Sequence, residues 1–78
     1  MKGKPMSLTE TKSGQKARII SIDGGTALMK KFESLGLRVG SHIVNLSGDF
    51  MKGPVVVQNG ATQLAIGRGM AKKIIVEI

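Results

Sequence analysis

Short runs of β-branched residues alternate with glycines along most of the chain. Fourteen residues are Val or Ile and eleven are Gly, and the glycines fall between the apolar runs. Runs of this length, separated by residues that favour turns, are typical of short strands in a small all-β protein. The pattern predicts a lead-in from Leu8 to Gly14 and strands over residues 15–22, 41–46 and 73–77.

A hairpin is predicted around Asn59-Gly60, because two β runs flank this two-residue connection. Asn-Gly favours a type I′ turn, in which both central residues have positive φ. The prediction pairs Gln58 with Ala61. Because side chains alternate between the two faces of a strand, four apolar residues then share the face assigned to the core: Val55, Val57, Leu64 and Ile66.

One helix is predicted over residues 26–35, where Leu28, Phe32 and Leu35 form an apolar stripe at helical spacing. The Thr26 hydroxyl is expected to cap its first turn. Gly36 suits the left-handed position after the last turn, and Leu37 could then fold back on Phe32 in a Schellman motif. A tight turn is predicted at residues 67–69, with a helical turn through residues 70–72.

These elements add up to a mainly β domain of about five strands with one short helix after the first strand. A flat sheet of this size would leave two open edges and much apolar surface exposed, so a small bent barrel is the better solution. We predict an SH3-like barrel over residues 7–78, with an OB-like barrel as the alternative. Residues 1–6 are predicted to be a flexible tail.

The composition narrows the classes of function. The 78 residues carry a net charge of +7, contain no cysteine, and have no apolar run longer than three residues. Disulfides and membrane-spanning helices are therefore excluded, and a cytoplasmic location fits best. The positive charge could attract nucleic acid or an acidic protein. With two Phe and no Trp or Tyr, the chain has no base-stacking platform, so nucleic acid is the less favoured partner.

The residues that carry most enzyme and metal chemistry are nearly missing. His42 is the single histidine, and the five acidic residues are scattered without metal-ligand spacing. His42 could ligate a metal only in a site shared across a dimer. There is no phosphate-binding glycine motif and no nucleophile with a paired base. We therefore expect no catalytic residues, no intrinsic cofactor and no enzyme activity.

Basic side chains remain as candidates for contact with a partner protein. Two lysine doublets are predicted near the ends of structural elements, and two arginines lie in turns. Charges at such places usually need no explanation beyond solubility, but they could also flank a docking face for an acidic partner. The candidate partner-binding residues are Lys30, Lys31, Arg38, Arg68, Lys72 and Lys73. Met29, Met51 and Met70 are expected mainly to fill the core.

The ordered set of these motifs resembles the FeoA family, the small ferrous iron transport proteins A. The resemblance covers about residue 7 to the C-terminus, and Leu35-Gly36-Leu37 at the end of the helix is its best single piece. The remaining matching positions, in chain order, are Leu8, Gly14, Ala17-Arg18-Ile19, Gly24-Gly25, Gly40, Gly53-Pro54, Leu64-Ala65-Ile66, Ala71, Ile74 and Val76. Val39 departs from the proline common in the family at that place.

The resemblance implies an SH3-like barrel that acts in the cytoplasm beside FeoB, the membrane ferrous iron transporter with a GTPase domain. It implies an accessory or regulatory protein that binds this partner without entering the membrane. It also implies weak or partner-dependent binding of Fe²⁺ or another transition metal, and it leaves a homodimer open. Two alternatives remain: a basic nucleic-acid-binding barrel, and a metal-sensing domain like the C-terminal domain of DtxR-type repressors.

Overall fold

The computed structural model describes residues 4–47 and 53–78, which form a mainly β domain. Met51, one of the three methionines expected to fill the core, lies outside the described residues, whereas Met29 and Met70 pack against the core. In chain order the elements are β1 (Pro5–Ser7), the 3-10 helix η1 (Leu8–Glu10), β2 (Lys16–Ile22), α1 (Gly25–Ser34), β3 (His42–Asn45), β4 (Val55–Asn59), β5 (Thr62–Ile66), α2 (Arg68–Ala71) and β6 (Ile74–Glu77).

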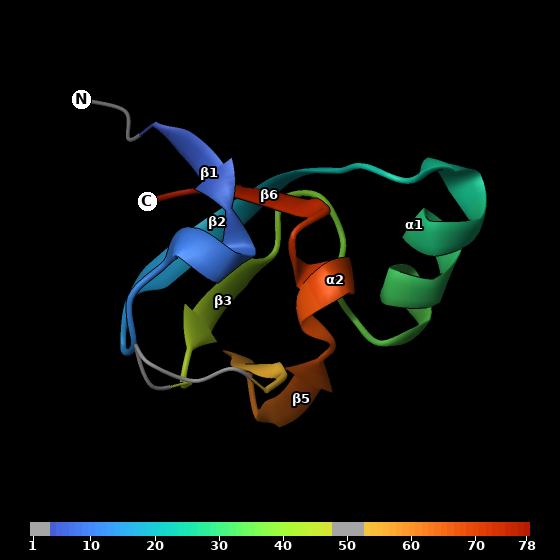
Figure 1. The fold of residues 1–78 in the computed structure, drawn as a ribbon. Coiled ribbons are helices and arrows are strands. Elements are labelled where there is room, and N and C mark those ends of the chain that lie inside the picture. Colours follow the sequence, from blue (N-terminus) through green and yellow to red (C-terminus); the bar gives the residue numbers. More distant parts are fainter. Residues whose placement is uncertain (1–3, 48–52) are drawn as a thin grey trace.

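The strands form one antiparallel sheet in the order β1-β6-β2-β3-β4-β5. Figure 1 shows the strands bending around a common interior, with α1 held out to one side. Within the described residues β1 and β5 do not pair with each other, so the sheet stays open. The architecture confirms the predicted mainly β, SH3-like small barrel, with one strand more than expected.

The additional strand is β1, and its first two residues, Pro5 and Met6, lie in the segment predicted to be a tail. Pro5 pairs with Glu77 and Met6 with Val76, so these two residues are ordered against β6. Proline is tolerated here because an edge strand has one side that needs no N–H donor. The Met6 side chain also packs against the core. The prediction of a tail was therefore wrong for Pro5 and Met6, while residues 1–3 lie outside the described part.

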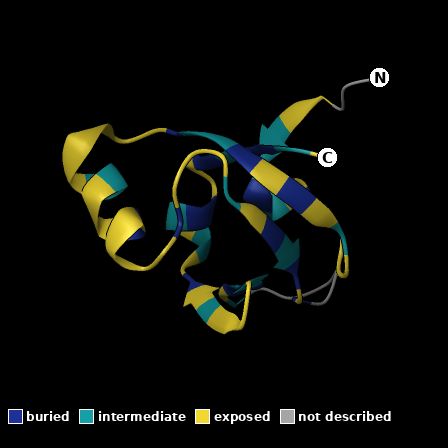
Figure 2. Ribbon diagram, turned by 180° about the vertical axis from the view of Figure 1, so that it is seen from behind, coloured by how far each residue is buried: buried dark blue, intermediate teal, exposed yellow. Residues whose placement is uncertain are grey.

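The core lies between the bent sheet and the helices, and β2 shows how the sequence builds it. Ala17 and Ile19 are buried at alternate positions, and a bulge at Ile20 then shifts the register so that Ile22 is buried next. Figure 2 shows burial concentrated along the strands. The buried apolar residues are Leu8, Ala17, Ile19, Ile22, Phe32, Leu37, Ile43, Val55, Val57, Ile66, Ala71, Ile74 and Val76.

The β4–β5 hairpin forms as predicted, but its turn and register differ. Asn59 pairs with Thr62, so the two turn residues are Gly60 and Ala61. Only Gly60 has positive φ, at 63°, which is the pattern of a type II′ turn with glycine at its first central position. The register is shifted by two residues from the prediction. Since strand faces repeat every two residues, this shift leaves the predicted core face correct.

The two helices are close to the predicted positions. The N-cap of α1 is Gly24, with φ of 123°, and the expected side-chain cap by Thr26 is wrong because the helix begins one residue earlier, at Gly25. The Schellman motif is confirmed: Gly36 N–H donates to the Glu33 carbonyl and Leu37 N–H to the Phe32 carbonyl, at 2.9 and 2.8 Å. Among the described residues, no helix has the length and apolar character to cross a membrane.

Candidate docking surface

Helix α1 is fastened to the rest of the domain at both of its ends. Before its first turn, the Asp23 N–H donates to the Lys73 carbonyl at 2.7 Å, which joins the helix to the α2–β6 connection. After its last turn, Asn59 Nδ2 donates to the Gly36 carbonyl at 2.7 Å, which joins it to the tip of the β4–β5 hairpin. These bonds hold α1 beside β5 and α2, and a groove runs between them.

The groove is mostly apolar and has a volume of about 160 Å³. Phe32 and Ile66 are buried at its base, whereas Leu35 is 41% exposed at one side. The full lining is Lys31, Phe32 and Leu35 from α1, with Ala65, Ile66, Gly67 and Met70 from the other wall. The arrangement can take an apolar side chain from a partner, with a cation at its rim.

Leu35 was predicted to face the core, and the structure corrects this. It is the C-cap residue of α1, and the chain reverses at Gly36 immediately after it. The reversal brings Leu37 into the core, fully buried, in the place that the helical stripe assigned to Leu35. Of the predicted stripe, Phe32 is buried and Leu28 partly buried. The apolar spacing indicated the stripe but not where the helix ends.

Of the four predicted partner-binding lysines, Lys31 lines this groove. Lys30 and Lys31 are exposed on α1, and Lys72 and Lys73 are exposed after α2. Within the described residues none of the four forms a salt bridge. The Lys73 stem lies beside Gly24, since a Cβ added at that glycine would stand 3.4 Å from Lys73 Cδ. Lys73 therefore lies beside the start of α1, whereas Lys31 lies at the groove toward the end of that helix.

Arg38 lies beyond α1, in the turn that leads to β3. Its side chain is exposed, and its N–H donates to Ser41 Oγ at 3.3 Å. It follows the Schellman reversal by two residues, so it is placed past the end of the helix and does not line the groove. The structure thus keeps Arg38 at the periphery of the candidate surface.

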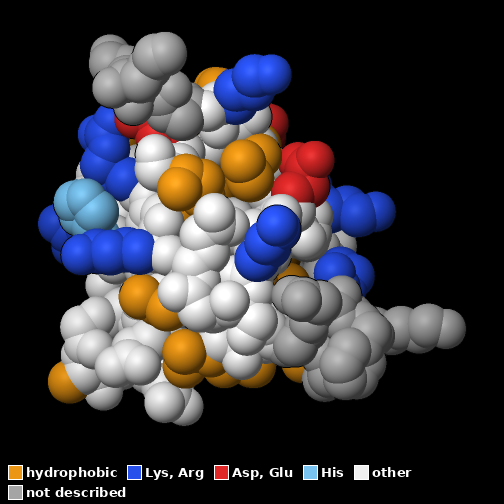
Figure 3. All heavy atoms as spheres, turned by 90° about the vertical axis from the view of Figure 1, so that its left-hand side faces the viewer, with side chains coloured by type: hydrophobic (Ala, Val, Ile, Leu, Met, Phe, Trp, Pro, Cys, Tyr) orange, Lys and Arg blue, Asp and Glu red, His pale blue; other side chains and the backbone are white. Residues whose placement is uncertain are grey.

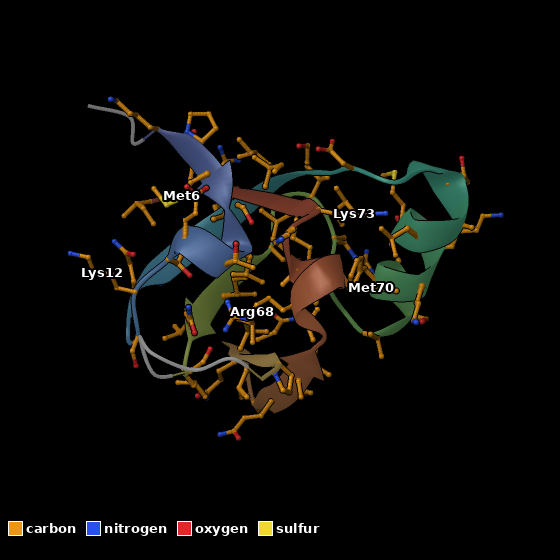
Figure 4. All side chains as sticks on the ribbon, viewed as in Figure 1. Met6, Lys12, Arg68, Met70 and Lys73 are labelled. Atoms are coloured by element: carbon orange, nitrogen blue, oxygen red, sulfur yellow. The ribbon has the colours of Figure 1, made fainter. Side chains whose placement is uncertain are left out.

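Arg68 is separated from the other candidates. Successive helical residues are rotated by about 100°, so Arg68 and Met70 lie on opposite sides of the single turn α2. Figure 4 shows Met70 on the side toward α1 and Arg68 on the side toward η1. Arg68 is half-buried and lines a different pocket of about 360 Å³. The sequence predicted the helical turn but did not indicate this division.

The pocket beside Arg68 contains a buried polar network that the sequence reasoning missed. Asn45 Nδ2 donates to the Thr11 Oγ1 and to the Thr11 carbonyl, at 2.7 and 3.1 Å. Asn45 Oδ1 accepts from the N–H and the hydroxyl of Ser47, at 2.8 and 2.6 Å. The network ties the segment after η1 to the end of β3. The available signal was Asn45 within a β-branched run, because a buried side-chain amide needs several hydrogen-bond partners.

His42 lies away from the groove, on the outer face of β2 and β3. It lines a depression of about 360 Å³ together with Lys16 and Arg18, and Figure 3 shows the pale-blue histidine with Lys or Arg side chains on either side. Arg18 Nη2 forms a salt bridge with Glu77 Oε1 at 2.9 Å. Neighbouring cations oppose the binding of a metal cation. Among the described residues, no three His, Cys, Asp or Glu side chains gather into a metal site.

Comparisons with known proteins agree on one family. The family model described as the FeoA domain matches residues 6–78. A curated protein of Methanocaldococcus jannaschii, named "Putative Fe(2+) transport protein A", is 34% identical over 70 residues, which are 90% of this chain and 83% of that protein. A crystal structure of an iron uptake regulatory protein, FeoA, superposes with a TM-score of 0.85 at 30% identity, covering 96% of this chain and 99% of the other.

A further likeness extends to a larger regulator and concerns the fold alone. A manganese-dependent transcriptional repressor superposes with a TM-score of 0.81 at 20% identity. The match covers 95% of this chain but 41% of the repressor. The same small barrel therefore occurs in this chain and as one part of a longer metal-dependent protein.

Proposed function

The chain belongs to the FeoA family, and from this premise we propose that it is an accessory protein of ferrous iron transport that docks on the cytoplasmic GTPase domain of a FeoB-type transporter. The proposal places the protein in the cytoplasm. The observation that carries it is the apolar groove between α1 and β5–α2, with the exposed Lys31 at its rim. An accessory role rather than catalysis is supported by the family and by a composition with one histidine and no cysteine.

The groove supports docking through two separate contributions. Its volume of about 160 Å³ suits one large apolar side chain. Burying such a side chain contributes about 1.5–3 kcal/mol. Lys31 at the groove, together with the exposed Lys30 on the same helix, would attract an acidic segment and raise the association rate more than the final affinity. We therefore infer that the partner presents an apolar anchor next to acidic residues.

The experiment is a titration of the labelled chain with the transporter's cytoplasmic domain. Leu35→Gln changes an exposed groove residue, so the fold should survive while the complex dissociates faster. Lys30→Glu with Lys31→Glu should slow association, most strongly at low salt. The matched control, Lys12→Glu with Lys16→Glu, makes the same charge change away from the groove. Equal binding by all variants would show that the groove is not the docking site.

A basic nucleic-acid-binding barrel is the second candidate, favoured by the depression around Lys16, Arg18 and His42. Binding there would neutralise phosphates, so the affinity would fall steeply as salt rises. The discriminating measurement is a titration with duplex DNA or RNA at two salt concentrations. Steep salt-dependent binding to the duplex, without binding to the transporter domain, would favour this candidate over docking.

A further inference from the structure

Strand β5 is an open edge of the sheet. It has five residues and pairs only with β4 among the described parts of the chain. The opposite edge, β1, has three residues and begins with Pro5. Short length and proline are two of the features that protect edges from pairing with another chain, and β5 has neither. Of the two edges, β5 is thus the one suited to accept a further strand.

The register identifies the backbone groups that β5 leaves free. In a two-residue hairpin the residues next to the turn, Asn59 and Thr62, form a hydrogen-bonded pair, and such pairs then alternate along the strands. Residues 62, 64 and 66 therefore bond to β4, while Gln63 and Ala65 direct their N–H and C=O outward. The bond from Leu46 N–H to the Val56 carbonyl, at 2.7 Å, agrees with this alternation because Val56 faces β3.

The hairpin that carries this edge is electrically neutral. No Lys, Arg, Asp or Glu occurs from residue 53 to residue 67, in a chain with 17 charged residues and a net charge of +7. Charged side chains are the other common protection of an edge, and β5 lacks them too. An acidic partner finds no cation on this strand. An uncharged strand is therefore the matching partner, and β5 of a second copy of this chain is such a strand.

We propose that β5 pairs with β5 of a second copy of this chain, antiparallel and centred on Leu64. In this register Gln63 lies opposite Ala65 of the second copy, and Ala65 opposite its Gln63. Each pair exchanges two N–H to C=O bonds, so all four outward groups on each copy are used. The arrangement has two-fold symmetry and joins the two sheets into one, which is the closed, isologous geometry of most dimers.

The dimer would be weak and concentration-dependent. A single strand pair buries less than the roughly 1,000 Å² of a stable interface, so the monomer persists at low concentration. The first test follows amide hydrogen exchange by NMR across a dilution series, together with sedimentation. We expect a monomer–dimer equilibrium in which protection of the Gln63 and Ala65 amides falls on dilution, while the Leu64 amide, bonded to β4, stays protected. A monomer at every concentration, or exchange at Gln63 and Ala65 independent of concentration, would overturn the proposal.

A charge exchange provides the second test. Gln63 is exposed, so Gln63→Lys and Gln63→Glu should both fold. In the proposed register the two introduced charges face each other diagonally, so each variant alone repels its own copy. We expect each to be monomeric and their mixture to form a heterodimer. Ala61→Lys and Ala61→Glu, in the exposed turn of the same hairpin, are the matched controls and should leave the dimer unchanged. A dimer that survives in Gln63→Lys, or a mixture that stays monomeric, would contradict this pairing.

Discussion

Replacing Phe32 with alanine tests how α1 is held against the sheet. Phe32 is 1% exposed and belongs to the core, and its carbonyl accepts the bond from Leu37 N–H that closes the helix. The substitution removes the ring but leaves that backbone bond available. The loss of stability therefore measures packing between helix and sheet rather than the end of the helix.

The expected loss is large for so small a domain. Removing a buried Phe side chain costs about 3–5 kcal/mol through lost burial and the cavity that remains. A domain of 78 residues, at about 0.05–0.15 kcal/mol per residue, has a free energy of unfolding of about 4–12 kcal/mol. Phe32→Ala should thus remove at least a quarter of the free energy of unfolding. If that free energy is near the lower end of its range, the substitution should remove nearly all of it.

Urea unfolding followed by circular dichroism measures the effect. With a slope of about 1 kcal/mol per molar urea, the midpoint should fall by about 3–5 M. The matched control is Leu35→Ala, which changes the 41% exposed C-cap residue of the same helix and should cost less than about 1 kcal/mol. An unchanged midpoint for Phe32→Ala, or an equal loss for both variants, would refute the orientation of α1.

Three further outcomes are expected from stability measurements. Gly60→Val should lower the free energy of unfolding in urea by more than about 1 kcal/mol, because a φ of 63° strains a β-branched residue. Ala61→Val, at the neighbouring turn position, should not have this effect. Equal losses of stability for the two variants would contradict the assigned turn. Asn45→Ala should cost about 1–3 kcal/mol, because buried polar groups of Thr11 and Ser47 lose their partner, and a neutral result would contradict the network. Fe²⁺ under anaerobic conditions, or Zn²⁺, should leave the thermal midpoint of the isolated chain unchanged; a midpoint that rises with ion concentration would favour metal sensing.

The hairpin shows why a sequence can predict a core better than a turn. Its core face was correct because the alternation of Val55, Val57, Leu64 and Ile66 survives a register shift of two residues. The predicted turn type was wrong because an Asn-Gly pair has two possible places in a hairpin. It can fill both turn positions, as predicted, or Asn can end the strand while Gly begins the turn, as in the structure. The bond from Asn59 to the Gly36 carbonyl accompanies the second arrangement, and no local pattern reveals this contact across the fold.

The groove of the candidate surface was not predicted, for a related reason. Lysine doublets at element ends indicated exposed cations, and all four lysines are exposed, with Lys31 at the groove. The apolar groove was missed because the spacing assigned Leu35 to the buried stripe. The helix ends at Leu35 and the chain reverses at Gly36, so that the Leu35 side chain is exposed at the groove instead. Spacing along a helix reports its faces, whereas a groove depends on which other element packs beside it.

The docking proposal is tested most directly by mapping the contact on an isotope-labelled chain. The chain is titrated with the cytoplasmic domain of the FeoB-type transporter, and its backbone amide signals are followed by NMR. We predict that the signals of Leu35, Gly67 and Met70, which line the groove, shift or broaden first. Changes confined to Lys16 and His42, on the outer face of the sheet, or no change at all, would contradict the account.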